Sequence, residues 1–198
     1  MSVTAVPLQP TPRKVVLFLA LGIMAIAALA AVLAWAGTRN RNAEFFAGNA
    51  GEEGVVTTAS GLQYKVLEAG QGPTPTDNDH VFITYEGRLL DGSVFDQSQQ
   101  PVDFPVQGVV PGFSEALKLM PRGARLKVWI PPELGYGAEP RKDPTGRTVI
   151  PANAVLAFDI GMLGFLPEAQ FRQMQMGMGP MGGAMSGDAA PPPPGDGR

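Results

Sequence analysis

VVPGFSEALKLMPRG, residues 109–123, is the stretch that defines the centre of the fold. Its apolar side chains recur at i, i+3, i+4 and i+7, the spacing of residues on one face of an α-helix. The residues that share this face are Phe113, Ala116, Leu117 and Met120. Pro121 and Gly123 follow and end the helix. The stretch therefore predicts one short helix whose apolar face has to be covered by other elements.

The sequence on both sides of this helix alternates apolar and polar residues, the pattern of half-buried β-strands. The alternating runs lie at 62–66, 81–86, 125–130 and 154–163. The residues expected on their buried faces include Leu62, Tyr64, Val66, Val81, Ile83, Tyr85, Leu156, Phe158, Ile160 and Met162. Asp91-Gly92 favours a tight hairpin turn, and residues 133–150 form a predicted loop rich in Gly and Pro. Together these patterns indicate an α+β fold with an antiparallel sheet and one short helix.

The N-terminal region has a different composition, because residues 15–36 form an unbroken apolar run without a charged side chain. A helix rises about 1.5 Å per residue, so this run can cross a bilayer core about 30 Å thick. Arg13 and Lys14 precede it, which favours a cytoplasmic N-terminus at 1–14. We therefore expect a single transmembrane anchor. A cleaved signal segment is the alternative, since Ala34-Trp35-Ala36 has the small-x-small form of a cleavage site.

The remaining segments follow from changes in composition along the chain. Residues 37–56 show no sustained period and are interpreted as a linker, and residues 57–166 form the folded domain. Residues 167–198 begin with a short polar helix-like stretch and continue as a Met-, Gly- and Pro-rich tail that is predicted to be disordered. The tail methionines are a candidate Cu(I) site, although low-complexity sequence is the simpler interpretation. They are Met174, Met176, Met178, Met181 and Met185.

The charge and the reactive residues exclude several function classes. The formal net charge is -3 and no cluster of Lys and Arg is present, so we expect no nucleic-acid partner. The chain has no Cys and one His, which excludes thiol catalysis and a multi-histidine metal site. A Ser-His-Asp triad would depend on His80 alone, and His80 is expected to be exposed at the start of a strand. We expect neither a metal nor a cofactor.

Five short motifs follow one another between residues 61 and 165. They are Phe95-Asp96, VVPGFSEAL at 109–117, IPPELGYG at 130–137, VIP at 149–151 and LAFD at 156–159. Their order and spacing closely resemble those of the FKBP family of peptidyl-prolyl isomerases, in a bacterial-like, membrane-anchored form. The resemblance implies a curved antiparallel β-sheet wrapped around the short α-helix, preceded here by the single N-terminal transmembrane helix. It also implies an apolar cleft between sheet and helix that holds a proline.

The resemblance implies roles for ten residues around this cleft. The catalytic set would be Tyr85, Phe95, Asp96, Phe113, Tyr136 and Phe158, and the substrate-binding set would be Val109, Val110, Val149 and Ile150. The Tyr136 hydroxyl and the Val110 N–H would hydrogen-bond substrate carbonyls. Asp96 would orient and polarise the cleft without acting as a base. Phe104 is expected to be an ordinary core residue.

The chemistry of proline isomerisation suits these residue types. An X–Pro bond isomerises in tens to hundreds of seconds unaided, because the C–N bond has partial double-bond character. No bond is broken, so an apolar pocket that removes water from the amide and binds the twisted state can suffice. We therefore expect an isomerase acting on unfolded or nascent polypeptides with X–Pro bonds, on the periplasmic side of the membrane or secreted after cleavage. A macrolide is a candidate ligand by family resemblance. The alternative is a chaperone or peptide-binding module with little catalysis.

Three departures from the family pattern concern the cleft. Phe113 stands where the most active members usually place Trp, and the stretch after Asp96 lacks the Arg that often bonds this carboxylate. The loop at 139–148, EPRKDPTGRT, is longer than in compact members and locally basic. Extended loops at this place overhang the cleft and can alter substrate choice, whereas a solvated loop is the simpler interpretation.

Overall fold

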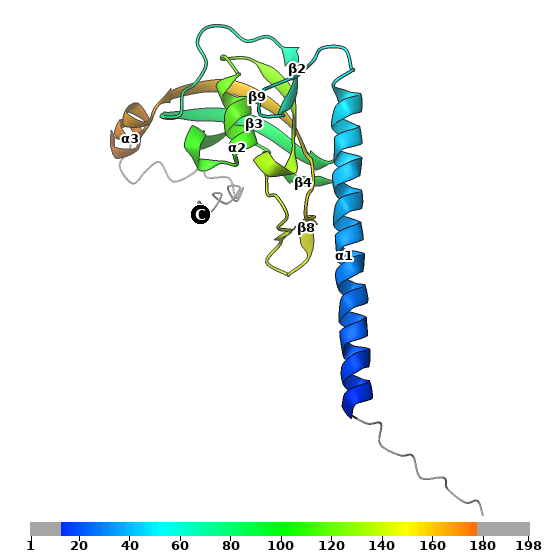
Figure 1. Ribbon diagram of the computed structural model, residues 1–198. Coiled ribbons are helices and arrows are strands. Elements are labelled where there is room, and N and C mark those ends of the chain that lie inside the picture. Colours follow the sequence, from blue (N-terminus) through cyan, green and yellow to red (C-terminus); the bar gives the residue numbers. More distant parts are fainter. Residues whose placement is uncertain (1–12, 178–198) are drawn as a thin grey trace, which may run out of the picture. The chain divides into compact units, whose positions relative to one another are not determined.

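The computed structural model describes residues 13–177 (Figure 1). The chain divides into two compact units, residues 1–41 and 42–198. Helix α1, Arg13–Asn49, begins in the first unit. It is the one helix among the described residues that is long and apolar enough to cross a membrane, with a mean hydropathy of 2.0 and no buried residue in its apolar window. Length and composition thus agree with the expected N-terminal apolar helix, although a signal sequence shares both properties.

The second unit contains an antiparallel sheet with the strand order β1-β2-β6-β9-β3-β4, and β5 pairs with β3 beside this path. The strands are β1 Val55–Thr57, β2 Gln63–Glu68, β3 Asp79–Leu89, β4 Val94–Gln97, β5 Val102–Pro105, β6 Arg125–Ile130 and β9 Leu156–Pro167. Two short 3-10 helices are η1 Val106–Gly108 and η2 Pro132–Leu134. The predicted α+β class with an antiparallel sheet is confirmed.

Helix α2, Pro111–Lys118, packs on this sheet, and the long strands β3 and β9 curve past it (Figure 1). The four predicted face residues, Phe113, Ala116, Leu117 and Met120, are at most 3% exposed. The predicted buried faces of β3 and β9 are confirmed as well. Val81, Ile83 and Tyr85 of β3 are buried in the same core as Leu156, Phe158, Ile160 and Met162 of β9. One continuous core thus joins the helix to the two central strands.

The segment 37–56 differs from the expected linker, because α1 continues to Asn49 and β1 begins at Val55. The last turns of α1 find hydrogen-bond partners in the folded domain. The Gln63 side chain donates to the Phe46 carbonyl oxygen at 2.8 Å, and the Asn49 side chain donates to the Gln63 Oε1 at 2.8 Å. Because the end of α1 covers Gln63, this residue is only 2% exposed. Val66, which was expected to be buried, is 50% exposed.

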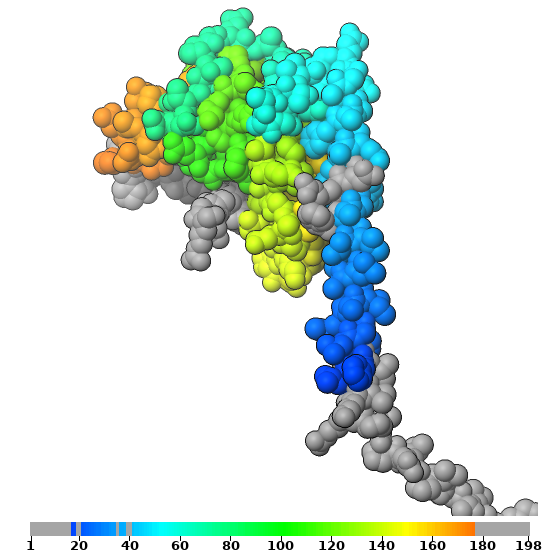
Figure 2. Space-filling view, viewed as in Figure 1, coloured from blue at the N-terminus to red at the C-terminus, as the bar shows by residue number. Residues whose placement is uncertain are grey.

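The predicted loop at 133–150 contains a small hairpin. Strands β7, Arg141–Lys142, and β8, Thr148–Ile150, pair antiparallel in a sheet of their own. The turn between them is held by Asp143, whose Oδ1 accepts hydrogen bonds from the backbone N–H groups of Thr145 and Arg147. The space-filling view shows the hairpin, in yellow and yellow-green, projecting from the rest of the domain (Figure 2).

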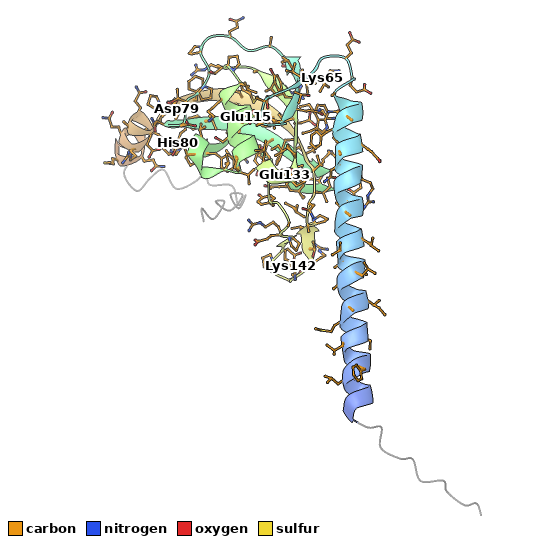
Figure 3. All side chains as sticks on the ribbon, viewed as in Figure 1. Lys65, Asp79, His80, Glu115, Glu133 and Lys142 are labelled. Carbon is orange, nitrogen blue, oxygen red and sulfur yellow. The ribbon has the colours of Figure 1, made fainter. Side chains whose placement is uncertain are left out.

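Helix α3, Glu168–Gly177, follows β9 and covers the start of β3. Its presence agrees with the short polar helix-like stretch expected after Pro167, whereas residues 178–198, with most of the tail methionines, lie outside the described residues. The Phe171 ring stacks on the His80 ring at 3.9 Å between centroids, and His80 Nε2 pairs with the Glu168 carboxylate. Figure 3 shows His80 next to α3. The expectation of an exposed His80 was wrong, since α3 leaves the residue only 8% exposed.

Candidate active site

Eight side chains line a cleft between α2 and the sheet, and six of them are aromatic. They are Tyr85, Phe95, Asp96, Phe104, Val110, Phe113, Tyr136 and Phe158. They come from β3, β4, β5, β9, α2 with the residue before it, and the loop after η2. All six residues of the expected catalytic set therefore meet around one cleft, together with Val110 and Phe104.

Phe158 on β9 is the centre of the aromatic group. Its ring lies edge to face against Phe113 at 4.9 Å and against Phe95 at 5.5 Å, and the Tyr85 ring is 6.3 Å away. Such edge-to-face pairs contribute about 0.5–1.5 kcal/mol beyond the burial of area. The rings therefore hold one another in place and form a firm apolar wall.

Gly87 on β3 allows two of these rings to pack directly on the strand. A Cβ at this position would lie 2.7 Å from the Phe95 ring and 2.8 Å from the Phe158 ring. Both distances are shorter than van der Waals contact, so any other residue would push these rings away from the strand and into the cleft. Gly87 thus determines how closely the Phe95 and Phe158 rings approach β3.

The cleft is narrow. The empty space among its lining side chains amounts to about 310 Å³ when the part open to solvent is included, but the centre of a water molecule can move through only about 10 Å³. The apolar rings are therefore close to one another, and a ligand ring that enters has to displace solvent and shift these side chains slightly apart.

Two polar groups in the cleft are bonded to each other. The Tyr85 hydroxyl donates a hydrogen bond to Asp96 Oδ2 at 2.8 Å. Burial, together with this hydrogen bond and the charge of Asp96, raises the pKa of Tyr85 far above its ordinary value. Tyr85 is therefore a neutral donor at every physiological pH, and it holds Asp96 in the way expected of the absent Arg.

Tyr136 differs from Tyr85, because no hydrogen bond within the described residues engages its hydroxyl. Burial raises the pKa of Tyr136, the nearby Arg141 charge opposes this rise, and the Asp96 charge adds to it. The Arg141 guanidinium lies over the Tyr136 ring, 4.7 Å from its centroid. The Tyr136 hydroxyl is thus a neutral donor that remains available to a ligand.

The loop that carries Tyr136 is braced from behind by two asparagines. The Asn153 N–H donates to the Gly137 carbonyl oxygen at 2.8 Å. Asn153 has a positive φ of 56°, a conformation that Asn tolerates better than most residues. Its own carbonyl oxygen accepts a hydrogen bond of 2.8 Å from the Asn42 side chain near the end of α1. The end of α1 therefore supports one wall of the cleft.

Three residues of the expected substrate-binding set do not line the cleft. Val109 and Ile150 are buried in the core at 7% and 5% exposure, and Val149 packs against it half-buried. Phe104 is buried in the core as expected, at 6% exposure, and it also lines the cleft. Its position on β5 opposite Val81 brings it there, and the sequence pattern offered no signal for this pairing. Within residues 13–177, no group of three or more His, Asp or Glu side chains is placed to hold a metal ion.

Comparisons with known families match both parts of this architecture. Residues 72–163 match the family described as "FKBP-type peptidyl-prolyl cis-trans isomerase", and residues 28–66 match the "Domain amino terminal to FKBP-type peptidyl-prolyl isomerase". The second match spans much of α1 and the strands that follow it. This match agrees with the observed contacts between the end of α1 and β2.

Individual relatives agree with the family matches. The peptidyl-prolyl cis-trans isomerase Mip of Coxiella burnetii is 44% identical over 122 residues, covering 60% of this chain and 51% of the relative. The outer membrane protein MIP of Legionella longbeachae is 39% identical over 122 residues, covering 60% of this chain and 50% of the relative. The chain thus spans about half the length of these curated relatives.

One solved structure is matched over almost its whole length. The crystal structure of a peptidyl-prolyl cis-trans isomerase from Pseudomonas syringae pv. tomato has a TM-score of 0.61 and 36% sequence identity. The match covers 65% of this chain and 93% of that one. Fold, motif order and identity agree, and the chain belongs to the FKBP-type peptidyl-prolyl cis-trans isomerase family.

Proposed function

We propose that this protein accelerates rotation about X–Pro bonds in polypeptide chains whose proline enters the aromatic cleft. The observation that carries the proposal is the lining itself, in which six of eight side chains are aromatic and one carboxylate is present. An apolar enclosure of this kind suits a pyrrolidine ring, and its one carboxylate is already bonded to the Tyr85 hydroxyl. Isomerisation needs no nucleophile, because no covalent bond is broken.

The cleft would lower the rotation barrier by preferring the twisted amide. The barrier is about 18–20 kcal/mol and reflects the delocalisation that keeps the peptide planar. Water bonded to the amide oxygen strengthens this delocalisation, and the rings of Phe113 and Phe158 would replace that water with an apolar surface. Binding that is stronger in the twisted state than in either planar state accelerates rotation in both directions.

The polar groups would hold the peptide on either side of the rotating bond. The Tyr136 hydroxyl, which has no partner among the described residues, would donate to a substrate carbonyl. The Tyr85 hydroxyl is already used by Asp96, so this pair would act as a fixed dipole beside the amide. Donors that are oriented before the substrate arrives need no reorganisation in the transition state.

The apolar part of α1 supports a place of action at a membrane. It has the length and composition of a membrane span, and the relative from Legionella longbeachae carries the name of an outer membrane protein. We propose that the domain faces the periplasm and acts there on unfolded or nascent chains. An apolar macrolide that places a ring in the cleft would compete with these chains.

The test follows cis-to-trans conversion of a short peptide with an apolar residue before proline, using the full chain in detergent. We expect Phe158→Ala to lower kcat/KM by about tenfold or more, because it removes the centre of the wall. Tyr136→Phe should lower it about threefold to tenfold, the value of one hydrogen bond. Val66→Ala, at an exposed position on β2, is the matched control and should change nothing.

Two results would overturn the proposal. Acceleration that persists in both cleft variants would place the active site elsewhere. A folded protein that binds proline peptides without accelerating their isomerisation would instead be a peptide-binding module or chaperone.

A further inference from the structure

The β7–β8 hairpin places a cation beside the cleft. Arg141, the first residue of β7, pairs with Ile150 of β8, and its guanidinium lies 4.7 Å from the centre of the Tyr136 ring. An Arg over an aromatic face is held by cation–π attraction. Figure 3 shows the neighbouring Lys142 on the same hairpin. Because Tyr136 lines the cleft, the positive charge of Arg141 lies one aromatic ring away from it.

This charge has no counter-ion in the described part of the chain. Arg141 takes part in no ion pair there, and its Nε is buried without a hydrogen-bond acceptor. A buried donor without an acceptor costs about 1–3 kcal/mol. The guanidinium therefore has unused hydrogen-bonding capacity that a carboxylate of a ligand can satisfy through its other N–H groups.

Arg147 on the same hairpin differs from Arg141, because it has a carboxylate partner. Its Nε lies 3.2 Å from Asp143 Oδ2, and its side chain is 80% exposed. Hydrogen bonds from Thr145 are the main cause that lowers the pKa of Asp143, which keeps this partner charged. In this hairpin, Arg147 therefore stabilises the turn through Asp143, whereas the charge of Arg141 faces the Tyr136 ring.

We propose that Arg141 is a specificity residue that favours substrates with an acidic side chain next to the proline. The proposal rests on the proposed function, since the cleft has to hold the proline. A peptide bonded to the Tyr136 hydroxyl brings its flanking side chains within reach of the guanidinium. A Glu or Asp side chain there supplies the missing acceptor, and Arg binds carboxylates with a planar pair of N–H groups.

The test uses six peptides that differ only beside the proline, with Glu, Gln or Lys placed either before or after it. Both kcat/KM and the dissociation constant, from an NMR titration, are measured for the full chain. The wild type should prefer Glu over Gln by about threefold to fivefold at one of the two positions. Lys should be the poorest, and salt should reduce the preference.

Three variants decide the role of the charge. Arg141→Met should bring the Glu/Gln ratio to about one, and Arg141→Lys should restore part of it, because a point charge replaces the planar group. Arg147→Met is the matched control, from the same hairpin, and should keep the wild-type ratio. A structural role for Arg141 would lower the values for all peptides together and leave the ratio unchanged.

The outcomes separate this inference from the proposed function. Equal Glu and Gln values in the wild type, or a preference that survives Arg141→Met, would overturn the role of Arg141 while isomerase activity stands. If no peptide is accelerated, the proposed function fails, and the ratio of dissociation constants still decides whether Arg141 selects acidic peptides.

Discussion

Aromatic side chains gather at both ends of β3, but only one end is left open. At the start of the strand, the His80 ring is covered by Phe171 of α3 at 3.9 Å. Further along the same strand, the Tyr85 ring packs 6.1 Å from Phe113 and 6.3 Å from Phe158, and these three rings line the cleft. One cluster is closed by its own chain, and the other is available to a ligand.

The difference shows that aromatic residues at a strand end do not by themselves make a binding site. At the His80 end, the helix that follows β9 supplies a ring that stacks on His80 and a carboxylate that pairs with its Nε2. At the Tyr85 end, the aromatic rings line a cleft, and Gly87 lets two of them pack directly against the strand. The Tyr85 end is therefore a candidate binding site, whereas α3 covers the His80 end.

Removal of the central ring of the open end should have the largest effect. Phe158→Ala leaves a cavity where Phe113, Phe95 and Tyr85 now pack, and we expect a loss of about 3–5 kcal/mol in the free energy of unfolding. Urea unfolding measures this loss. A change below about 1 kcal/mol would mean that the rings do not support one another, and the open end would then be a loose surface.

Removal of the covering ring at the closed end should be smaller and should leave the cleft alone. Phe171→Ala removes the stacking on His80 and the contact with Phe82, for about 1–2 kcal/mol. We expect faster amide hydrogen exchange in α3 and unchanged isomerase activity. If activity falls as well, the two ends of β3 are coupled and the contrast between them does not hold.

The Tyr85 hydroxyl gives the open end a characteristic pH dependence. Burial and Asp96 raise the pKa of Tyr85 above the ordinary value of about 10, so the folded state retains this proton more strongly than the unfolded state. The resulting stabilisation is fully present below pH 10 and is lost as the pH rises above it. Tyr85→Phe should cost about 1 kcal/mol at pH 7 and weaken this alkaline loss.

Urea unfolding of wild type and Tyr85→Phe between pH 8 and pH 11 measures the effect. The closed end supplies the control, because His80→Phe removes no tyrosine and should preserve the steepness of the alkaline loss. Identical curves for wild type and Tyr85→Phe would show that Tyr85 is not held as a neutral donor.

Removal of the hydrogen bond that supports the Tyr136 loop should have the smallest effect on activity. Asn42→Ala removes one hydrogen bond to the Asn153 carbonyl oxygen, for about 0.5–1.5 kcal/mol of stability. We expect KM for a proline peptide to rise by less than about threefold, because Tyr136 becomes less well positioned. Ala43, the exposed neighbour, provides the control variant Ala43→Ser. A larger loss of activity than of stability would make the end of α1 part of the site.

Local periodicity predicted the buried faces of the elements that pack directly on the central core. The face of α2 and the alternation of β3 and β9 follow from spacings of 3.6 and 2 residues, and the structure has them as expected. The motif order placed Tyr85, Phe95 and Phe158 at one cleft by resemblance, and the structure brings them together there.

Features that depend on distant segments were not predictable from these patterns. Gln63 is buried because α1 covers it, and His80 is buried because α3 covers it. Phe104 reaches the cleft because β5 pairs with β3 at Val81. Arg141 reaches Tyr136 because residues 141–150, predicted to be a loop, form the β7–β8 hairpin. Each contact joins segments that no local spacing connects.

The pairing of β3 with β9 also has a kinetic consequence. Leu89 pairs with Leu156 and Asp79 with Pro167, so these strands meet only after the long intervening chain has been closed into a loop. Loop-closure entropy makes such pairings slow compared with local helix formation. Both ends of β3 depend on this one event, and we expect the aromatic cleft and the His80 stack to appear in the same late phase of refolding.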